Sequence, residues 1–254
     1  MKILLVGCGK MGGALLKRWQ DMDIAAQTCV VDITRDIKTA QDIPKDFYPD
    51  IIVFAVKPQT LPDIIADYAP YAGSLFLSIV AGKTISFLQK YLGEDARVIR
   101  AMPNTPALIG QGITGLYASS QVTQQDKKAA ERLLLATGEI LWLSDETLID
   151  PLTALSGSGP AYVFLLIEVL TKAGIHIGLA PDIAEKLARQ TVIGSAALAK
   201  AESETSAEIL RNNVTSPGGT TAAAVDILTK NSALQKIFDE ALAAATARAK
   251  ELSA

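Results

Sequence analysis

The stretch that decides the fold is Lys2-Ile3-Leu4-Leu5-Val6-Gly7-Cys8-Gly9-Lys10-Met11-Gly12. An apolar run leads into a G-x-G-x-x-G turn, and apolar residues at helical spacing follow it (Met11, Leu15, Leu16 and Trp19). A second apolar strand, Cys29-Val30-Val31, ends at Asp32. In a dinucleotide site, Gly7 allows the tight turn, Gly9 lets the pyrophosphate approach the backbone, and Gly12 lets helix and strand pack closely. The stretch therefore predicts a nucleotide-binding βαβ unit whose helix start receives the phosphates.

Strand and helix patterns alternate through the rest of the first half of the chain. We expect strands over residues 51–56, 75–80, 97–101, 112–118 and 139–143, with helices between most of them. Residues 33–49 are polar and contain Pro44 and Pro49, which predicts only a short or irregular helix there. Because parallel strands need crossover helices, this order predicts an α/β fold with a doubly wound, mostly parallel sheet of the Rossmann type.

No strand pattern appears after about residue 148. Residues 160–173 are apolar almost all round and stop at Gly174, and helical spacing continues over 182–200 and 232–252. We therefore predict a dinucleotide-binding domain over residues 1–150 and an all-helical domain over 151–254. A helix that is apolar on every side must be covered, so the helical domain is expected to form a dimer interface.

Composition narrows the function classes. The 254 residues are 49% hydrophobic and 20% charged, which is typical of a globular protein. The net charge of −3 and the lack of a basic run argue against nucleic acid as a partner. No run of 18 apolar residues lacks a charge, so no membrane span is expected. The two cysteines, Cys8 and Cys29, have no metal spacing and are expected to be buried, reduced thiols in the cytoplasm.

A second informative run is Val214-Thr215-Ser216-Pro217-Gly218-Gly219-Thr220-Thr221. Ser216 followed by Pro217 is typical of an N-cap and first residue of a helix. The two glycines would leave the first turn open, and its N–H groups with the nearby hydroxyls would suit a small carboxylate. A capped helix start without a ligand gives the same pattern, so the run alone leaves both interpretations open.

The residues that are missing also restrict the chemistry. His176 is the only histidine, no G-x-S-x-G motif is present, and no metal-ligand cluster occurs. A dehydrogenase that oxidises an alcohol usually needs a base. Reduction of an activated C=N bond needs only a cofactor, orientation and a source of protons.

Over essentially its whole length the chain resembles pyrroline-5-carboxylate reductase, the last enzyme of proline biosynthesis. Five runs carry the resemblance: the glycine-rich turn, residues 55–58 (Ala-Val-Lys-Pro), 100–106 (Arg-Ala-Met-Pro-Asn-Thr-Pro), 154–162 and 214–221. The resemblance implies that NADPH or NADH reduces the imine 1-pyrroline-5-carboxylate to L-proline. It also implies a homodimer through the helical domain, and some members of the family assemble dimers into decamers.

The resemblance also implies the site residues. The cofactor contacts would be Val6, Gly7, Cys8, Gly9, Lys10, Met11, Gly12, Asp32, Thr34, Ala55, Val56, Lys57, Pro58, Ile79, Val80, Ala81 and Asn213. The substrate contacts would be Glu146, Ser216, Gly219, Thr220 and Thr221, with the catalytic role given to the Thr221 hydroxyl beside the ring nitrogen. Asp32 favours a free ribose 2′-hydroxyl, whereas Thr34 and Arg35 allow a 2′-phosphate, so the preferred cofactor stays open.

Two other functions would fit a chain with a dinucleotide-binding domain. A related hydroxy-acid dehydrogenase would place a catalytic lysine on a helix of the second domain, where only Lys172 and Lys186 are available early on. Neither lies in a glycine-rich helical motif. A non-catalytic nucleotide sensor would be expected to lack Ser216 or Thr221, and the chain retains both.

Overall fold

The computed structural model describes residues 1–25 and 27–253, which form two compact units. The first unit contains Met1–Ser158 and the C-terminal segment that begins at Ala244, and the second is Gly159–Ala243. The first is built on a seven-stranded sheet with the strand order β2-β1-β3-β4-β5-β6-β7. Its strands are β1 (Lys2–Val6), β2 (Gln27–Val31), β3 (Ile51–Phe54), β4 (Leu75–Ser78), β5 (Val98–Met102), β6 (Gly112–Ala118) and β7 (Gly138–Trp142).

The sheet is parallel except at one pair, β5 and β6. A parallel neighbour needs a long crossover, whereas only the short 3₁₀ helix Thr105–Ile109 separates β5 from β6, so β6 returns antiparallel. The predicted α/β class with a mostly parallel sheet is confirmed. The polar stretch after β2 holds a single 3₁₀ turn, Ala40–Asp42, as its two prolines predicted.

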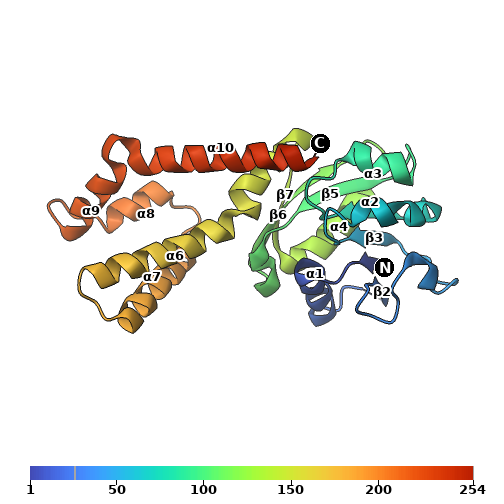
Figure 1. Ribbon diagram of the computed structural model, residues 1–254, viewed down its shortest axis with the longest axis horizontal. Coiled ribbons are helices and arrows are strands. Elements are labelled where there is room, and N and C mark those ends of the chain that lie inside the picture. The colour runs from blue at the N-terminus through green and yellow to red at the C-terminus, as the bar shows by residue number, and fades with distance from the viewer. Residues whose placement is uncertain (26, 254) are drawn as a thin grey trace. The chain divides into compact units, whose positions relative to one another are not determined.

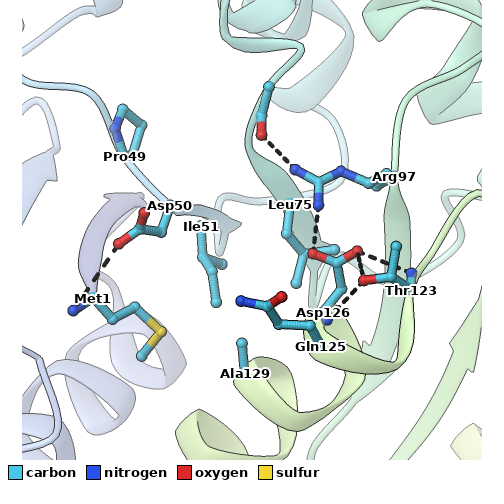
Figure 2. Close-up of a pocket in the computed structure, with 11 residues that line it drawn as sticks. Met1, Pro49, Asp50, Ile51, Leu75, Arg97, Thr123, Gln125, Asp126 and Ala129 are labelled. Carbon is cyan, nitrogen blue, oxygen red and sulfur yellow. Dashed lines mark hydrogen bonds and ion pairs between the residues drawn. The ribbon is translucent and has the colours of Figure 1, made fainter.

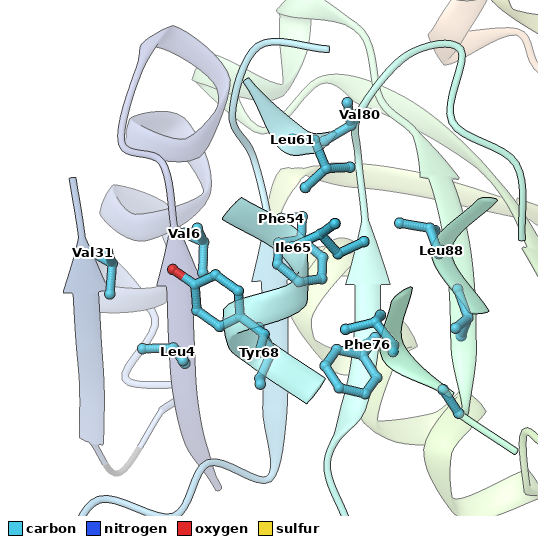
Figure 3. Close-up of a cluster of buried hydrophobic side chains, with 14 of the residues drawn as sticks. Leu4, Val6, Val31, Phe54, Leu61, Ile65, Tyr68, Phe76, Val80 and Leu88 are labelled. Carbon is cyan, nitrogen blue, oxygen red and sulfur yellow. The ribbon is translucent and has the colours of Figure 1, made fainter. Parts of the chain in front are cut away.

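Helices cover both faces of the sheet (Figure 1). On one face, α1 (Lys10–Asp21) and α4 (Gln124–Leu134) bury Leu15, Trp19 and Leu133 against the strands. On the other face lie α2 (Leu61–Ile64), the 3₁₀ helix Ile65–Tyr71 and α3 (Ile85–Leu92). They close the cluster drawn in Figure 3, in which Tyr68 and Phe76 flank Phe54. The two layers fix the sheet and leave the carboxyl ends of its strands as an edge on which ligands can bind.

The second unit is helical, as predicted for this half of the chain. Its helices are α6 (Gly159–His176), α7 (Pro181–Ala201), α8 (Ala207–Asn213), α9 (Thr220–Thr229) and the first half of α10 (Ala233–Ser253). The short α5 (Ile149–Leu152) belongs to the first unit. Helix α6 does not stop at Gly174 as predicted. Gly174 lies inside the helix. A Cβ at this position would lie 3.2 Å from the Cβ of Ala184 in α7, so the glycine allows the two helices to pack closely.

The limits of the compact units differ from the predicted division at residue 150. The chain passes to the second unit at Gly159, and the last turns of α10 are grouped with the first unit from Ala244 onward. The helical periodicity of the sequence continues unchanged through α10. It therefore does not indicate that the two halves of this helix belong to different compact units. The division into domains 1–150 and 151–254 remains a prediction about independent folding units.

One helical run bears on the expectation that the chain has no membrane span. The helical run from Glu146 to His176 is long and apolar enough to cross a membrane by length and composition. The sequence argument asked for 18 apolar residues without any charge, and Glu168 and Lys172 interrupt such a run. The two cysteines are free, with Cys29 buried and Cys8 only half-buried.

Candidate active site

The glycine-rich turn after β1 is shaped by close contacts to β3. Gly7 has a φ of +93°, and a Cβ there would lie 2.8 Å from the backbone of Ala55. A Cβ on Gly12 would lie 2.2 Å from the carbonyl oxygen of Gly7. Gly9 is different, because no heavy atom lies within 4 Å of the position its Cβ would take. Two of the glycines therefore serve packing, and the third leaves open space beside the backbone.

Helix α1 begins directly at this open space. Gly9 is its N-cap and offers no side chain to the helix start. The first intrahelical bond runs from the N–H of Gly13 to the carbonyl of Gly9, at 2.8 Å. The N–H groups of Lys10, Met11 and Gly12 precede that bond and point out of the helix start. With the helix dipole, they suit a phosphate group.

Asp32 lies at the end of β2, beside the turn. Its Oδ2 accepts a hydrogen bond of 2.6 Å from the N–H of Cys8, and its Oδ1 accepts bonds from the N–H and the hydroxyl of Thr34, at 2.9 and 2.6 Å. Burial works to raise the pKa of Asp32, but the hydrogen bonds from Thr34 and Cys8 and the nearby Arg35 charge outweigh it, so the pKa is lowered. Asp32 is therefore a carboxylate at neutral pH.

A cavity of about 460 Å³ opens at the carboxyl ends of β1, β2 and β3. Seven of the predicted cofactor residues line it: Val6, Gly7, Gly9, Asp32, Ala55, Val56 and Lys57. Its position at the carboxyl edge of a parallel sheet is the place where such folds bind ligands. The backbone cradle, the anion-binding helix start and the acceptor at Asp32 together fit a dinucleotide.

Other predicted cofactor residues lie outside this lining. Cys8, Lys10, Met11, Gly12, Thr34, Pro58, Ile79, Val80 and Ala81 do not border the cavity. The side chain of Val80 belongs to the buried core, so only its backbone is available to a ligand. Asn213 is the last residue of α8, in the second unit. Their roles as contacts stay predictions.

The structure adds lining residues to those predicted. Ile33, between Asp32 and Thr34, is 82% exposed, an unusual state for a large apolar side chain, and Lys38, Thr39, Thr60 and Tyr68 also line the cavity. Burial raises the pKa of Tyr68, so its hydroxyl stays protonated and can donate a hydrogen bond. In the sequence Tyr68 was only one residue of a helical core pattern. The packing of η2 (Ile65–Tyr71) under β1 and β3 is what turns it toward the cavity.

A second cavity, of about 520 Å³, lies at the opposite edge of the sheet, where β1, β3 and β4 begin (Figure 2). Its main charged group is Arg97, which pairs with Asp126 at 2.6 Å and donates a second hydrogen bond to the carbonyl of Gly73. Thr123 and Asp126 form a capping box at the start of α4. These polar groups satisfy each other, and their contacts hold α4 to the sheet.

Glu146, a predicted substrate contact, lies in the first unit. Its Oε1 accepts hydrogen bonds from Arg100 Nη1 at 2.6 Å and from the N–H of Ile85, the first residue of α3, at 2.8 Å. Arg100 is buried, and its Nη2 has no hydrogen-bond partner among the described residues. Glu146 is thereby fixed between β5 and the start of α3.

The other predicted substrate residues lie around the start of α9, and here the sequence prediction was wrong in detail. The helix does not begin at Pro217 with Ser216 as N-cap, because Gly218 has a φ of +69° and the N–H of Gly219 bonds to the carbonyl of Ser216 at 3.0 Å. Ser216–Gly219 is a β-turn with proline second and a left-handed glycine third, the pattern of type II. Helix α9 starts at Thr220, with Gly219 as its N-cap.

The corrected helix start still offers donors. The N–H groups of Thr220, Thr221 and Ala222 precede the first intrahelical bond, from Ala223 to Gly219. Four other helix-associated threonines, at positions 153, 171, 215 and 229, donate their hydroxyls to the carbonyl four residues earlier. Among the described residues, the hydroxyls of Thr220 and Thr221 have no such partner. They remain available to a ligand.

Similar proteins settle the family. A pyrroline-5-carboxylate reductase from Pseudomonas aeruginosa is 44% identical over 80% of this chain and 75% of its own length. The enzyme of that name from Vibrio alginolyticus is 32% identical over 99% of this chain and 97% of its own. The chain belongs to the pyrroline-5-carboxylate reductase family.

The family's domain model and solved structures agree with this membership. The model described as pyrroline-5-carboxylate reductase dimerisation matches residues 146–252. A pyrroline-5-carboxylate reductase from Coxiella burnetii has a TM-score of 0.90 and 36% identity, covering 99% of this chain and 98% of that one. The Plasmodium falciparum pyrroline carboxylate reductase, solved with NADP bound, has a TM-score of 0.86 and 30% identity, covering 100% and 98%.

A more distant likeness concerns the fold only. Prephenate dehydrogenase from A. aeolicus has a TM-score of 0.54 at 16% identity, over 99% of this chain and 86% of that one. Membership of the pyrroline-5-carboxylate reductase family therefore rests on the relatives with 30% identity or more, and the expected resemblance is confirmed.

Proposed function

We propose that this chain is an NAD(P)H-dependent oxidoreductase that reduces the C=N bond of 1-pyrroline-5-carboxylate to give L-proline. The observation that carries the proposal is the presence, in a member of this family, of a dinucleotide cradle at Gly7–Gly12 and a separate anion-binding helix start at α9. An enzyme of this kind needs one site for a large phosphorylated cofactor and one for a small carboxylate. Each of the two units supplies one of them.

The first unit holds the cofactor. The N–H groups at the start of α1 receive the pyrophosphate, and Gly9 leaves space for it to approach the backbone. Asp32 would accept a hydrogen bond from the adenosine ribose, and the exposed apolar side chain of Ile33 would offer a surface for the adenine. When bound, the reduced nicotinamide supplies the hydride that the reaction requires.

The second unit holds the substrate carboxylate. The free N–H groups at the start of α9 bind its oxygens, and Ser216 and Thr220 add hydroxyl donors. The Thr221 hydroxyl would hydrogen-bond the ring nitrogen and hold the imine in place. Reduction of the C=N bond adds a hydride to carbon and a proton from the solvent to nitrogen. No basic side chain is required, because the imine is reduced and no alcohol is deprotonated.

The chain is proposed to act as a cytoplasmic homodimer. Phe164, Leu165 and Leu166 of α6 are 64%, 55% and 49% exposed in the single chain. Helices of a second copy covering this surface agree with the family's dimerisation domain over residues 146–252. The apolar run that matches a membrane span in length is accordingly a protein-covered helix in this proposal.

The proposal is tested with purified protein, 1-pyrroline-5-carboxylate and NADH or NADPH. Loss of absorbance by the reduced nicotinamide that depends on the substrate, with proline as product, is the expected result. Oxidation of a panel of hydroxy acids with NAD or NADP, without turnover of the imine, would instead favour a dehydrogenase. Cofactor binding by a folded protein without either reaction would identify a nucleotide sensor.

A further inference from the structure

The hydrogen bonds that Asp32 accepts bear on which nicotinamide cofactor the enzyme prefers, a question that rests on the proposed function. A carboxylate has about four lone-pair positions that accept hydrogen bonds. Three donors already occupy positions on Asp32: the N–H of Cys8 on Oδ2, and the N–H and hydroxyl of Thr34 on Oδ1. One acceptor position on Oδ2 is left for a cofactor. We propose that this enzyme prefers NADH to NADPH, and that Asp32 determines the preference by accepting a hydrogen bond from the ribose 2′-hydroxyl.

The remaining acceptor can receive a hydroxyl but not a phosphate. A 2′-hydroxyl has a proton to donate to Oδ2. A 2′-phosphate carries a charge of about −1.5 to −2 at neutral pH and offers mainly acceptor oxygens. Placing it beside a carboxylate brings two like charges together without a shared proton. The hydrogen bonds from Cys8 and Thr34 also fix the carboxylate in place, so it cannot turn away to accommodate the phosphate.

Asp32 forms no direct ion pair, although the charge of Arg35 acts on it at longer range. In the part of the chain that the structure describes, no lysine or arginine nitrogen lies within 4.0 Å of its carboxylate. Arg35, the closest candidate in sequence, directs its Nη2 to the Sγ of Cys8 at 3.5 Å. Lys38 and Lys57 line the cavity, but Asp67 lines it as well. The two lysines of the lining are therefore matched by two carboxylates, Asp32 and Asp67, and the Asp32 carboxylate is the one fixed beside the glycine-rich turn.

The pairing of β1 with β2 places Asp32 beside the glycine-rich turn. Strands β1 and β2 are parallel neighbours with Val6 opposite Val31, and the N–H of Gly7 bonds to the carbonyl of Val31 at 2.8 Å. The residues that follow the two strands, the glycine-rich turn and Asp32, are therefore held side by side. A ribose bound at the turn would therefore lie within reach of Asp32.

The test compares the two cofactors in the full-length protein. We expect the wild-type kcat/KM for NADH to exceed that for NADPH roughly tenfold or more, as for one unscreened like-charge contact near a protein surface. Dissociation constants for NADH and NADPH, from nicotinamide fluorescence without substrate, are expected to differ in the same direction. Asp32→Asn, which keeps the shape, and Asp32→Ser, which makes space, are expected to shift the NADH/NADPH ratio toward NADPH by roughly tenfold in binding and in kcat/KM.

The matched control is Asp36→Asn. It makes the same change of charge four residues away, at an exposed position outside the cavity lining, and is expected to leave the ratio unchanged. A wild-type ratio near one, a preference for NADPH, or Asp32 variants with the wild-type ratio would each overturn the proposal. If an Asp32 variant does not fold, the wild-type binding ratio and the other variant decide. Selective binding of NADH without turnover of the imine would contradict the proposed function and leave this inference standing.

Discussion

At the scale of single residues, three glycines in one turn serve two purposes. Gly7 has a positive φ, a Cβ on Gly12 would lie 2.2 Å from the carbonyl oxygen of Gly7, and Gly9 has open space beside it. A side chain at the first two positions would clash with backbone that cannot move aside. A side chain at Gly9 would instead occupy the place proposed for the pyrophosphate. Packing thus requires glycine at two of these positions, and the proposed cofactor requires it at the third.

Thr221 is the residue proposed to contact the reacting nitrogen. Thr221→Ala removes its hydroxyl and keeps the backbone N–H groups that bind the carboxylate. A neutral hydrogen bond contributes about 0.5–1.5 kcal/mol, so kcat is expected to fall roughly two- to tenfold with KM for the imine nearly unchanged. Steady-state kinetics with saturating cofactor measure this.

The control for this variant is Thr229→Ala. It makes the same substitution at the far end of α9, where the hydroxyl bonds to the carbonyl of Val225 at 2.8 Å. We expect no change in kcat there. Equal losses in the two variants would mean that Thr221 acts through the stability of the helix and not on the substrate.

At the scale of elements, the turn before α9 determines how the helix start is presented. Ser216–Gly219 closes a tight turn, and Gly218 has the left-handed conformation that this turn needs. The first helical residue is therefore Thr220, and two of the three open N–H groups, those of Thr220 and Thr221, belong to residues that also carry hydroxyls. A helix starting at Pro217 would have placed the first turn on the two glycines instead.

Gly219 tests this arrangement. A Cβ at this position would lie 2.6 Å from Ser216 Oγ and 3.1 Å from its carbonyl oxygen. Gly219→Val is expected to raise KM for the imine by about tenfold or more, corresponding to about 1.4 kcal/mol of lost binding, and to leave the Kd of the cofactor unchanged. Gly219→Ala is expected to give a smaller increase, because the Ser216 hydroxyl can rotate away from a single methyl group.

The result that would contradict this prediction is a normal KM in Gly219→Val. The carboxylate would then bind elsewhere, and the anion-binding role of α9 would be wrong. Circular dichroism and cofactor fluorescence distinguish this outcome from simple misfolding, since the glycine lies in the second unit and the cofactor cradle in the first.

At the scale of the whole molecule, the second unit leaves much of its apolar surface exposed. Helix α6 has no buried residue in the single chain, and Phe164 is 64% exposed. Burying a side chain of this size stabilises by about 1.5–3 kcal/mol, so several of them provide a strong driving force for association. The family's dimerisation domain covers the same residues.

We therefore expect light scattering to show no species smaller than a dimer at micromolar concentration. Phe164→Glu is expected to produce monomers or insoluble protein, because it places a charge on the surface to be buried. Lys17→Glu, an exposed charge change on α1, is the control and should leave the mass unchanged. A folded, active wild-type monomer would contradict the prediction.

The sequence by itself determined the βαβ unit, the three glycines, Asp32, the helical second half and the family. These features depend on local patterns: apolar periodicity, the backbone freedom of glycine and the order of short motifs. They are visible in the sequence because the residues that form each motif lie close together in the chain. The sequence also predicted a helix start in the run 214–221, but the helix begins at Thr220 and not at Pro217, because Gly218 is left-handed and closes a turn.

Only the tertiary structure decided how distant parts meet. It gave β6 its antiparallel direction, turned Gly174 toward Ala184, and brought Tyr68 and Ile33 to the cofactor cavity. It also placed Cys8 and Thr34 as donors on Asp32, which leaves one acceptor position for the ribose. These facts are contacts between separate segments, and local patterns do not encode them because each partner satisfies the same pattern in many other arrangements.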